Sequence, residues 1–127
     1  MRDKLLKVLE NSYSPYSNFK VAAIVVMNDG KEFSGVNVEN ASYGATICAE
    51  RSAIVSAVSN GYKKGDFKEL YIMTKSNKVS TCCFICRQVI SEFFDKDSKV
   101  VCMNENSEEE YKVRDLCTFP FNDEDLK

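Results

Sequence analysis

The hydrophobic and polar positions of the chain follow two spacings, one typical of helices and the other of strands. In residues 2–10 leucines recur at helical spacing, and the Ser14-Pro15 pair closes that segment. Residues 20–27 are rich in Val, Ala and Ile, and an Asn-Asp-Gly turn at 28–30 leads into a second strand pattern at 32–38. The first part of the chain therefore predicts a short helix followed by a β-hairpin.

The rest of the chain alternates between the two spacings. Apolar residues recur at helical spacing in residues 48–60 and again in residues 83–94. Residues 69–74 and 100–103 each read as a short strand, and a weaker strand pattern follows an acidic linker at residues 110–113. The second part of the chain thus predicts two helices and three strands.

These elements together predict a single fold class. Strands that alternate with helices after an opening hairpin favour a mixed sheet with helices packed on its faces. We therefore expect a three-layer α/β/α domain with a mixed five-stranded sheet. A chain of 127 residues can bury one core but is too short for two ordinary domains, so residues 1–127 are expected to form one domain.

The charge of the chain narrows the classes of partner. Its 17 Lys and Arg are scattered among 19 Asp and Glu, so no basic stripe is present to bind the phosphates of a nucleic acid. The longest apolar run, residues 21–27, is far shorter than the roughly 18 residues of a membrane span. The opening residues lack the apolar stretch of a secretory signal. We expect a cytoplasmic protein that binds neither nucleic acid nor membrane.

The chain contains six cysteines and no histidine. Without an imidazole, every Ser-His-Asp and Cys-His mechanism is excluded, because no histidine can accept the proton of the nucleophile. Cysteines of a cytoplasmic protein are typically reduced and act as core residues or as metal ligands. Any hydrolytic chemistry in this chain must therefore use another activator.

Three of the cysteines lie where predicted helices begin. Cys48 starts the helix at 48–60, whereas Cys83 and Cys86 start the helix at 83–94. The positive end of a helix favours the thiolate that binds metal. Three thiolates with an open fourth position describe a catalytic zinc site, in which zinc lowers the pKa of a bound water to about 7. Glu50, two residues after Cys48, could reach that water as a proton shuttle.

Spacing alone leaves a second interpretation open, because a buried cysteine is often only a small core residue. Cys102 and Cys117 have no partner at a metal-binding spacing, so we expect them in the core. A centre with three thiolates would carry negative charge. Arg51 and Arg87 directly follow Glu50 and Cys86, and either arginine could hydrogen-bond a thiolate and offset that charge.

Longer motifs surround these residues. The chain reads Asn-Val-Glu-Asn-Ala-Ser-Tyr-Gly at 37–44, Thr-Ile-Cys-Ala-Glu-Arg at 46–51 and Cys-Arg-Gln-Val at 86–89. With the deaminase signature of a Cys-x-Glu followed later by Cys-x-x-Cys, the chain resembles the small homotetrameric, zinc-dependent cytidine deaminases over nearly its whole length. The resemblance implies that Cys48, Cys83 and Cys86 bind one zinc ion and that Glu50 is the catalytic acid and base.

The same resemblance implies roles for residues that their spacing alone would not single out. Asn37 and Glu39 would bind the ribose 3'-hydroxyl, Phe19 would flank the base, Ala49 would offer its N–H to the pyrimidine O2, and the Thr81 carbonyl would receive the amino group. Arg51, Arg87 and Gln88 would support the metal ligands. Tyr43 and Phe121 would approach the site of a neighbouring subunit, so the resemblance also implies a homotetramer.

The chain departs from the family pattern at two places. Where the family usually has Pro-Cys-Gly-Ala-Cys, residues 82–86 read Cys-Cys-Phe-Ile-Cys. Cys82 could in principle replace Cys83 as a ligand, but only Cys83 keeps the two-residue gap to Cys86, and we favour it. Thr-Phe-Pro-Phe at residues 118–121 stands where the family often has Pro-Gly-Ala-Phe.

The expected function is hydrolytic deamination of cytidine and deoxycytidine, with water attacking C4 of the pyrimidine and Glu50 carrying the protons. This reaction belongs to pyrimidine salvage. One alternative is a deaminase of another nucleoside, such as the antibiotic blasticidin S. The other is a non-catalytic oligomer that zinc stabilises, although a structural site has no need of Glu50.

Overall fold

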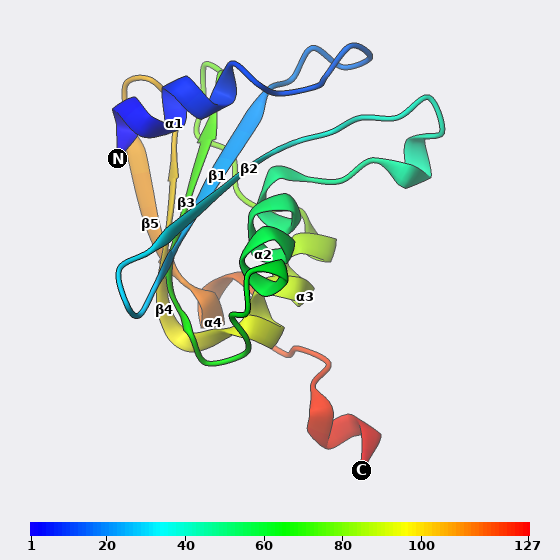
Figure 1. Cartoon of the computed structure of the whole chain (residues 1–127), viewed down its shortest axis with the longest axis vertical. Coiled ribbons are helices and arrows are strands. Elements are labelled where there is room, and N and C mark those ends of the chain that lie inside the picture. Colours follow the sequence, from blue (N-terminus) through cyan, green and yellow to red (C-terminus); the bar gives the residue numbers. More distant parts are fainter.

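The computed structural model describes residues 1–127, which form one mixed sheet with helices on both faces (Figure 1). The sheet order is β2-β1-β3-β4-β5. Its strands are β1 (Val21–Met27), β2 (Glu32–Val36), β3 (Phe67–Thr74), β4 (Phe94–Met103) and β5 (Glu108–Lys112). β3 and β4 are parallel, and the other neighbouring pairs are antiparallel. The predicted three-layer α/β/α class with five strands is confirmed.

Six helical segments complete the chain. They are α1 (Arg2–Leu9), the 3-10 turn η1 (Tyr43–Ala45), α2 (Ala49–Ser59), α3 (Phe84–Phe93), α4 (Val113–Leu116) and the 3-10 turn η2 (Asp123–Leu126). None of the helices is both long and apolar enough to cross a membrane.

Alternating residues of β1 separate the two layers of the core. Ala22 and Ile24 face α1 and pack with Leu5 in one buried cluster. Ala23 and Val25 face the opposite side, where they pack with buried residues of α2 and α3 in a larger cluster. This period of two is what a strand requires when helices cover both faces of its sheet.

The helix α2 lies directly against the sheet because β2 contains a glycine at the crossing. A Cβ atom at Gly35 would lie 2.3 Å from the backbone nitrogen of Ala53 and 2.7 Å from the carbonyl oxygen of Ala49. Such distances are too short for non-bonded atoms, so only glycine allows this approach. The crossing sets the position of the first turn of α2, where Cys48 and Glu50 lie.

The structure differs from the predicted elements mainly at their ends. β4 begins at Phe94, directly where α3 ends, rather than at residue 100, and the predicted strand at 110–113 gives way to α4 at Val113. The last ten residues, 118–127, extend away from the body of the molecule (Figure 1). We call them the C-terminal arm.

Candidate active site

Three cysteine sulfur atoms from two helix N-termini meet at one point. The Sγ atoms of Cys48, Cys83 and Cys86 all lie within 4.8 Å of one another, and those of Cys48 and Cys83 are 3.7 Å apart. Cys48 is the N-cap of α2, and Cys83 is the N-cap of α3, where its sulfur accepts a hydrogen bond from the backbone N–H of Cys86. The structure therefore brings together the three residues that the sequence proposed as ligands.

The donor set fits zinc. Zinc–thiolate bonds of about 2.3 Å at tetrahedral angles place two sulfur atoms about 3.8 Å apart, close to the 3.7 Å between Cys48 and Cys83. The metal-ligand group contains three thiols and no fourth residue, which leaves one tetrahedral position for water or substrate. Cys82 is not part of the group, so the geometry agrees with Cys83 as the ligand.

The electrostatics of the cluster favour a thiolate at Cys48. Hydrogen bonds with the Cys86 thiol and with Arg51 lower the pKa of Cys48 to about 5. Arg51 Nη2 lies 3.5 Å from Cys48 Sγ. The same bond between the two cysteines raises the pKa of Cys86, so without metal the shared proton stays on Cys86. Binding of a metal would release that proton.

Glu50 lies in the first turn of α2 and only 5% of its surface is exposed. Burial raises the pKa of its carboxyl group, and the neighbouring Cys48 thiolate raises it further. A carboxyl group with a raised pKa binds a proton more readily than an ordinary glutamate, as a general acid and base requires.

Glu50 and two of the thiols line one cavity of about 210 Å³. The cavity brings together seven residues proposed from the sequence, which are Phe19, Asn37, Cys48, Ala49, Glu50, Thr81 and Cys83. Val21, Thr46, Ile72, Thr74 and Ser80 complete its wall. A larger hollow of about 600 Å³ lies beyond the C-terminal end of α2 around Tyr62, and it contains none of the cysteines.

Two other proposed residues lie next to the cavity rather than in it. Glu39 and Tyr43 line an adjoining hollow of about 370 Å³, which shares Thr46 with the cavity. The Glu39 carboxylate accepts hydrogen bonds from the backbone N–H groups of Tyr16 and Ser17, at 3.0 and 3.1 Å, and from the Ser17 hydroxyl. These bonds lower the pKa of Glu39, and the bond from the Ser17 hydroxyl has the largest effect. Glu39 therefore faces the hollow as an anion.

Asn37 holds the backbone segment that carries Phe19, just before β1. Its Oδ1 accepts a hydrogen bond from the N–H of Val21 at 3.0 Å, and its Nδ2 donates to the carbonyl oxygen of Phe19 at 2.7 Å. The side chain thus shapes one wall of the cavity as well as lining it. Sequence reasoning had considered only a contact with ribose.

The two candidate arginines have different partners. Arg51 donates a hydrogen bond to the Cys48 sulfur, which is the role that the sequence suggested for either Arg51 or Arg87. Arg87 contacts no thiol. Its guanidinium donates to the carbonyl oxygen of Cys82 at 2.8 Å, to the Thr81 hydroxyl at 2.9 Å and to the carbonyl oxygen of Leu116 at 3.1 Å. Arg87 therefore braces the loop before Cys83.

Gln88 and Phe121 lie outside the cavity. The Gln88 side chain bonds the backbone of Phe121, whose ring belongs to the exposed arm. Of the departures from the family pattern, Cys82 is buried, and a hydrogen bond with Cys102 raises its pKa, so it remains a thiol. Phe84 and Ile85 are 77% and 63% exposed and do not line the cavity.

Sequence reasoning missed the hydroxyl groups of the site. Thr46, Thr74 and Ser80 line the cavity, and the buried Thr74 hydroxyl has no hydrogen-bond partner. Only Thr46 carried a usable signal, since it lies two residues before Cys48 in an extended segment and so shares its direction. Thr74 ends a strand that shows no polar pattern of its own, so nothing in the sequence marked it.

A buried carboxyl group beside three thiols with an open coordination position is typical of zinc-dependent hydrolytic enzymes. The comparisons with known proteins agree. A family model described as the cytidine and deoxycytidylate deaminase zinc-binding region matches residues 1–104. The chain therefore belongs to the cytidine and deoxycytidylate deaminase family, whose zinc cofactor the three thiols are suited to hold, and the resemblance drawn from its motifs is confirmed.

Individual relatives carry the same family name. The chain is 40% identical to a cytidine deaminase of Mycoplasma genitalium over 89% of this chain and 86% of that protein. It is 37% identical to a cytidine deaminase of Halalkalibacterium halodurans over 95% and 91% of the two chains. A crystal structure of the cytidine deaminase from Burkholderia pseudomallei superposes with a TM-score of 0.90 at 40% identity and covers 94% of each chain.

Proposed function

We propose that this chain catalyses the zinc-dependent hydrolysis of cytidine and deoxycytidine to uridine and deoxyuridine, with release of ammonia, as a step of pyrimidine salvage. The observation that carries the proposal is the convergence of the Cys48, Cys83 and Cys86 sulfur atoms at a cavity that the buried Glu50 lines together with Cys48 and Cys83. Relatives named cytidine deaminase, similar over almost their whole length, support the choice of substrate.

Bound zinc would be held by the three cysteines and would activate water for attack at C4 of the pyrimidine. Glu50 would take the proton of that water and give it to N3 of the ring. It would then carry the second proton to the amino group, which leaves as ammonia. The raised pKa of Glu50 supports its role as the base, because burial makes the carboxylate a better proton acceptor than an exposed one.

The walls of the cavity would orient the nucleoside. We assign the N–H of Ala49 to the pyrimidine O2, the carbonyl oxygen of Thr81 to the amino group and the ring of Phe19 to one face of the base. Asn37 and Glu39 are assigned to the ribose 3'-hydroxyl. Glu39 lies in the adjoining hollow, whereas the residues assigned to the base line the cavity. This arrangement supports placing the base in the cavity and the ribose in the hollow, because a nucleoside is long enough to extend past Thr46.

The protein is proposed to be a cytoplasmic homotetramer whose sites are shared between subunits. Tyr43 is 76% exposed and Phe121 is 58% exposed. Aromatic side chains exposed to this extent are typical of a surface that another chain covers. They would reach the site of a neighbouring subunit.

The two alternatives have less support. A relative named blasticidin-S deaminase, from Bacillus cereus, is 35% identical but covers only 58% of this chain and 56% of its own length. The bulky Phe84 and Ile85 lie outside the cavity lining, so they give no reason to expect a different base. A zinc-stabilised scaffold would not require a buried, protonatable Glu50 next to the ligands.

The test measures the loss of ultraviolet absorbance when the purified protein meets cytidine, deoxycytidine or blasticidin S. We expect turnover of the first two substrates, its loss on chelation and its return with zinc. Glu50→Gln should keep zinc and lower kcat by about 10²- to 10⁴-fold, the usual contribution of a general acid and base. Glu92→Gln, an exposed substitution on α3, is the control. A Glu50→Gln protein with wild-type kcat would contradict the proposal.

A further inference from the structure

The hydrogen bonds that join the C-terminal arm, residues 118–127, to the rest of the chain all come from one side chain, that of Gln88. Gln88 Nε2 donates to the carbonyl oxygen of Phe121 at 2.6 Å, and Gln88 Oε1 accepts from the N–H of Phe121 at 3.4 Å. The other hydrogen bonds and the one ion pair of the arm join residues within the arm. A side-chain amide that binds both polar groups of one residue imitates a strand neighbour and fixes that residue in direction as well as in position.

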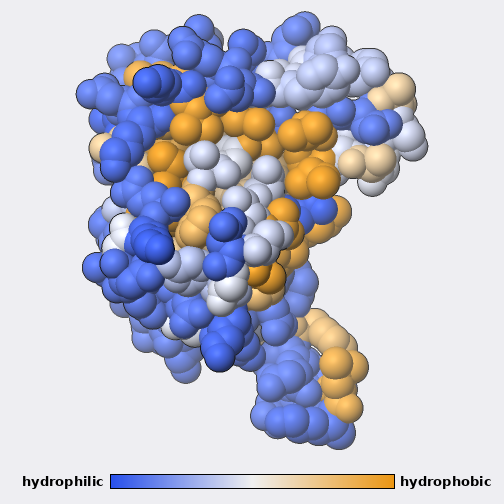
Figure 2. All heavy atoms as spheres, in the orientation of Figure 1, coloured by the Kyte–Doolittle hydropathy of each residue, from blue (hydrophilic) through white to orange (hydrophobic).

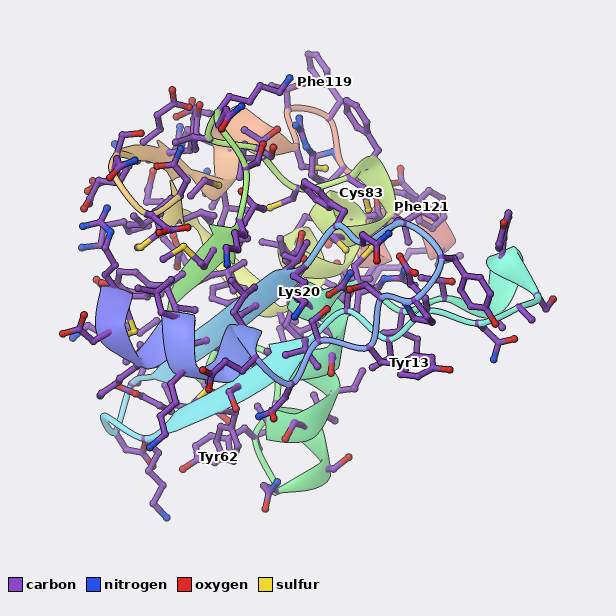
Figure 3. All side chains as sticks on the ribbon, turned by 90° about the horizontal axis from the view of Figure 1, so that it is seen from above. Tyr13, Lys20, Tyr62, Cys83, Phe119 and Phe121 are labelled. Carbon is purple, nitrogen blue, oxygen red and sulfur yellow. The ribbon has the colours of Figure 1, made fainter.

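The arm has little else to order it. Phe119 is 96% exposed and Leu126 is 78% exposed. Figure 2 shows apolar atoms along one side of the arm and hydrophilic atoms over the rest of it, and Figure 3 shows Phe119 pointing outward at the edge of the molecule. A segment with so little apolar burial gains little order from the hydrophobic effect, so its hydrogen bonds weigh heavily in setting its direction.

Two adjacent residues of α3 hold the chain on either side of the point where the arm begins. Arg87 donates to the carbonyl oxygen of Leu116, and Gln88 holds Phe121. Between them Pro120 restricts the backbone of the preceding residue to extended conformations. The first turn of the same helix carries Cys83 and Cys86. The position of the arm is therefore fixed relative to two of the proposed metal ligands.

We propose that Gln88 is a positioning residue, which aims the arm of one subunit so that Phe121 reaches the substrate cavity of a neighbouring copy of the chain. The inference rests on the proposed function, in which the sites are shared. It assigns to Gln88 a role in trans: the residue determines the affinity of a neighbour's site for nucleoside and leaves the metal and the proton carrier of its own subunit unchanged.

The first experiment isolates the tether. Gln88→Met keeps the length of the side chain and a good helix former but removes both hydrogen bonds. Chymotrypsin should cut the full-length Gln88→Met protein after Phe121 about tenfold faster than it cuts wild type, as the loss of one to two hydrogen bonds predicts. The bond after Phe119 resists the protease because Pro120 follows it. Glu92→Gln should leave the cleavage rate unchanged. Equal cleavage of Gln88→Met and wild type would overturn the proposal.

The second experiment tests the action in trans. Gln88→Met should raise KM for cytidine about tenfold and change kcat less than about twofold, with zinc content unchanged. Coexpression with Glu50→Gln subunits should restore KM, because these inactive copies supply intact arms to the active sites of the Gln88→Met subunits. A defect within one subunit would not be restored in this way.

The outcomes separate the two proposals. If wild-type protein deaminates cytidine but Gln88→Met shows the wild-type KM, the role of Gln88 in the site is wrong and the proposed function stands. An increase in KM that the inactive copies fail to restore would also overturn the action in trans. If wild type does not deaminate cytidine, the proposed function fails, and the cleavage rate alone decides whether Gln88 holds the arm.

Discussion

Cys82 and Cys83 have the same side chain and opposite environments. Cys83 is exposed at the N-terminus of α3 with its sulfur in the metal-ligand group, whereas Cys82 is buried and its thiol keeps its proton. The difference of one position reverses the direction of the side chain, as it does in any extended segment. Chemical identity alone therefore could not choose the ligand, but the two-residue gap to Cys86 could.

We expect these two cysteines to respond differently to substitution. Cys83→Ala should lose most bound zinc, because two thiolates remain, whereas Cys82→Ala should retain about one zinc per chain. Cys82→Ala should lower the free energy of unfolding by about 1 kcal/mol through the loss of buried contacts. Zinc content by elemental analysis checks the first expectation, and denaturant unfolding checks the second. Zinc loss from the Cys82 variant alone would reverse the ligand assignment.

Among the secondary-structure elements, α2 and its N-cap bring Cys48, Ala49 and Glu50 to the site. The position of this helix depends on its close packing against β2, where Gly35 leaves no side chain between them. Gly35→Ala would force the helix away from the sheet, and overpacking of this kind typically costs about 1–3 kcal/mol. We expect a lower midpoint of denaturant unfolding together with weaker zinc binding, since Cys48 moves with the helix. Gly44→Ala is the matched control, because a Cβ there meets nothing within 4 Å. Equal stability of the two variants would show that α2 can adapt.

At its other end α2 leads to Tyr62, whose hydroxyl donates to Asp29 Oδ2 at 2.7 Å and joins the helix to the β1–β2 turn. This bond lowers the pKa of Asp29 and raises the pKa of Tyr62 to about 12. A lowered carboxyl pKa contributes stability above the ordinary value of 3.8, and that contribution is lost as the pH falls through the folded-state pKa.

Tyr62→Phe should therefore lower the melting temperature at pH 7 by about 1–2 °C, a small effect because the pair is exposed. The difference from wild type should shrink below about pH 3.8, where Asp29 becomes protonated in the unfolded chain and then in the folded one. Calorimetry of the two proteins between pH 3 and pH 7 measures it. A difference that is constant over this range would assign the effect to packing.

At the scale of the whole molecule, the features that the sequence predicted well are those with a local signature. The hairpin, the helices at 48–60 and 83–94 and the mixed sheet follow from spacing and turn residues, and the cluster of three thiols follows from helix starts and family motifs. The sequence did not predict that β4 would begin at Phe94, because an exposed first half carries no apolar pattern. Nor could it predict that Arg87 bonds Leu116 and Gln88 bonds Phe121, because these partners lie 29 and 33 residues away along the chain.

The separation of the metal ligands along the chain has a consequence for folding. Cys48 and Cys83 are 35 residues apart, and β3, which pairs with β1 and β4, lies between them along the chain. Their sulfur atoms meet only after α2 and α3 have packed on the assembled sheet, because no local contact brings them together earlier. Zinc should therefore act late, with little effect on the rate of folding and a large reduction in the rate of unfolding. The metal that is proposed to activate water would then also set the lifetime of the folded chain.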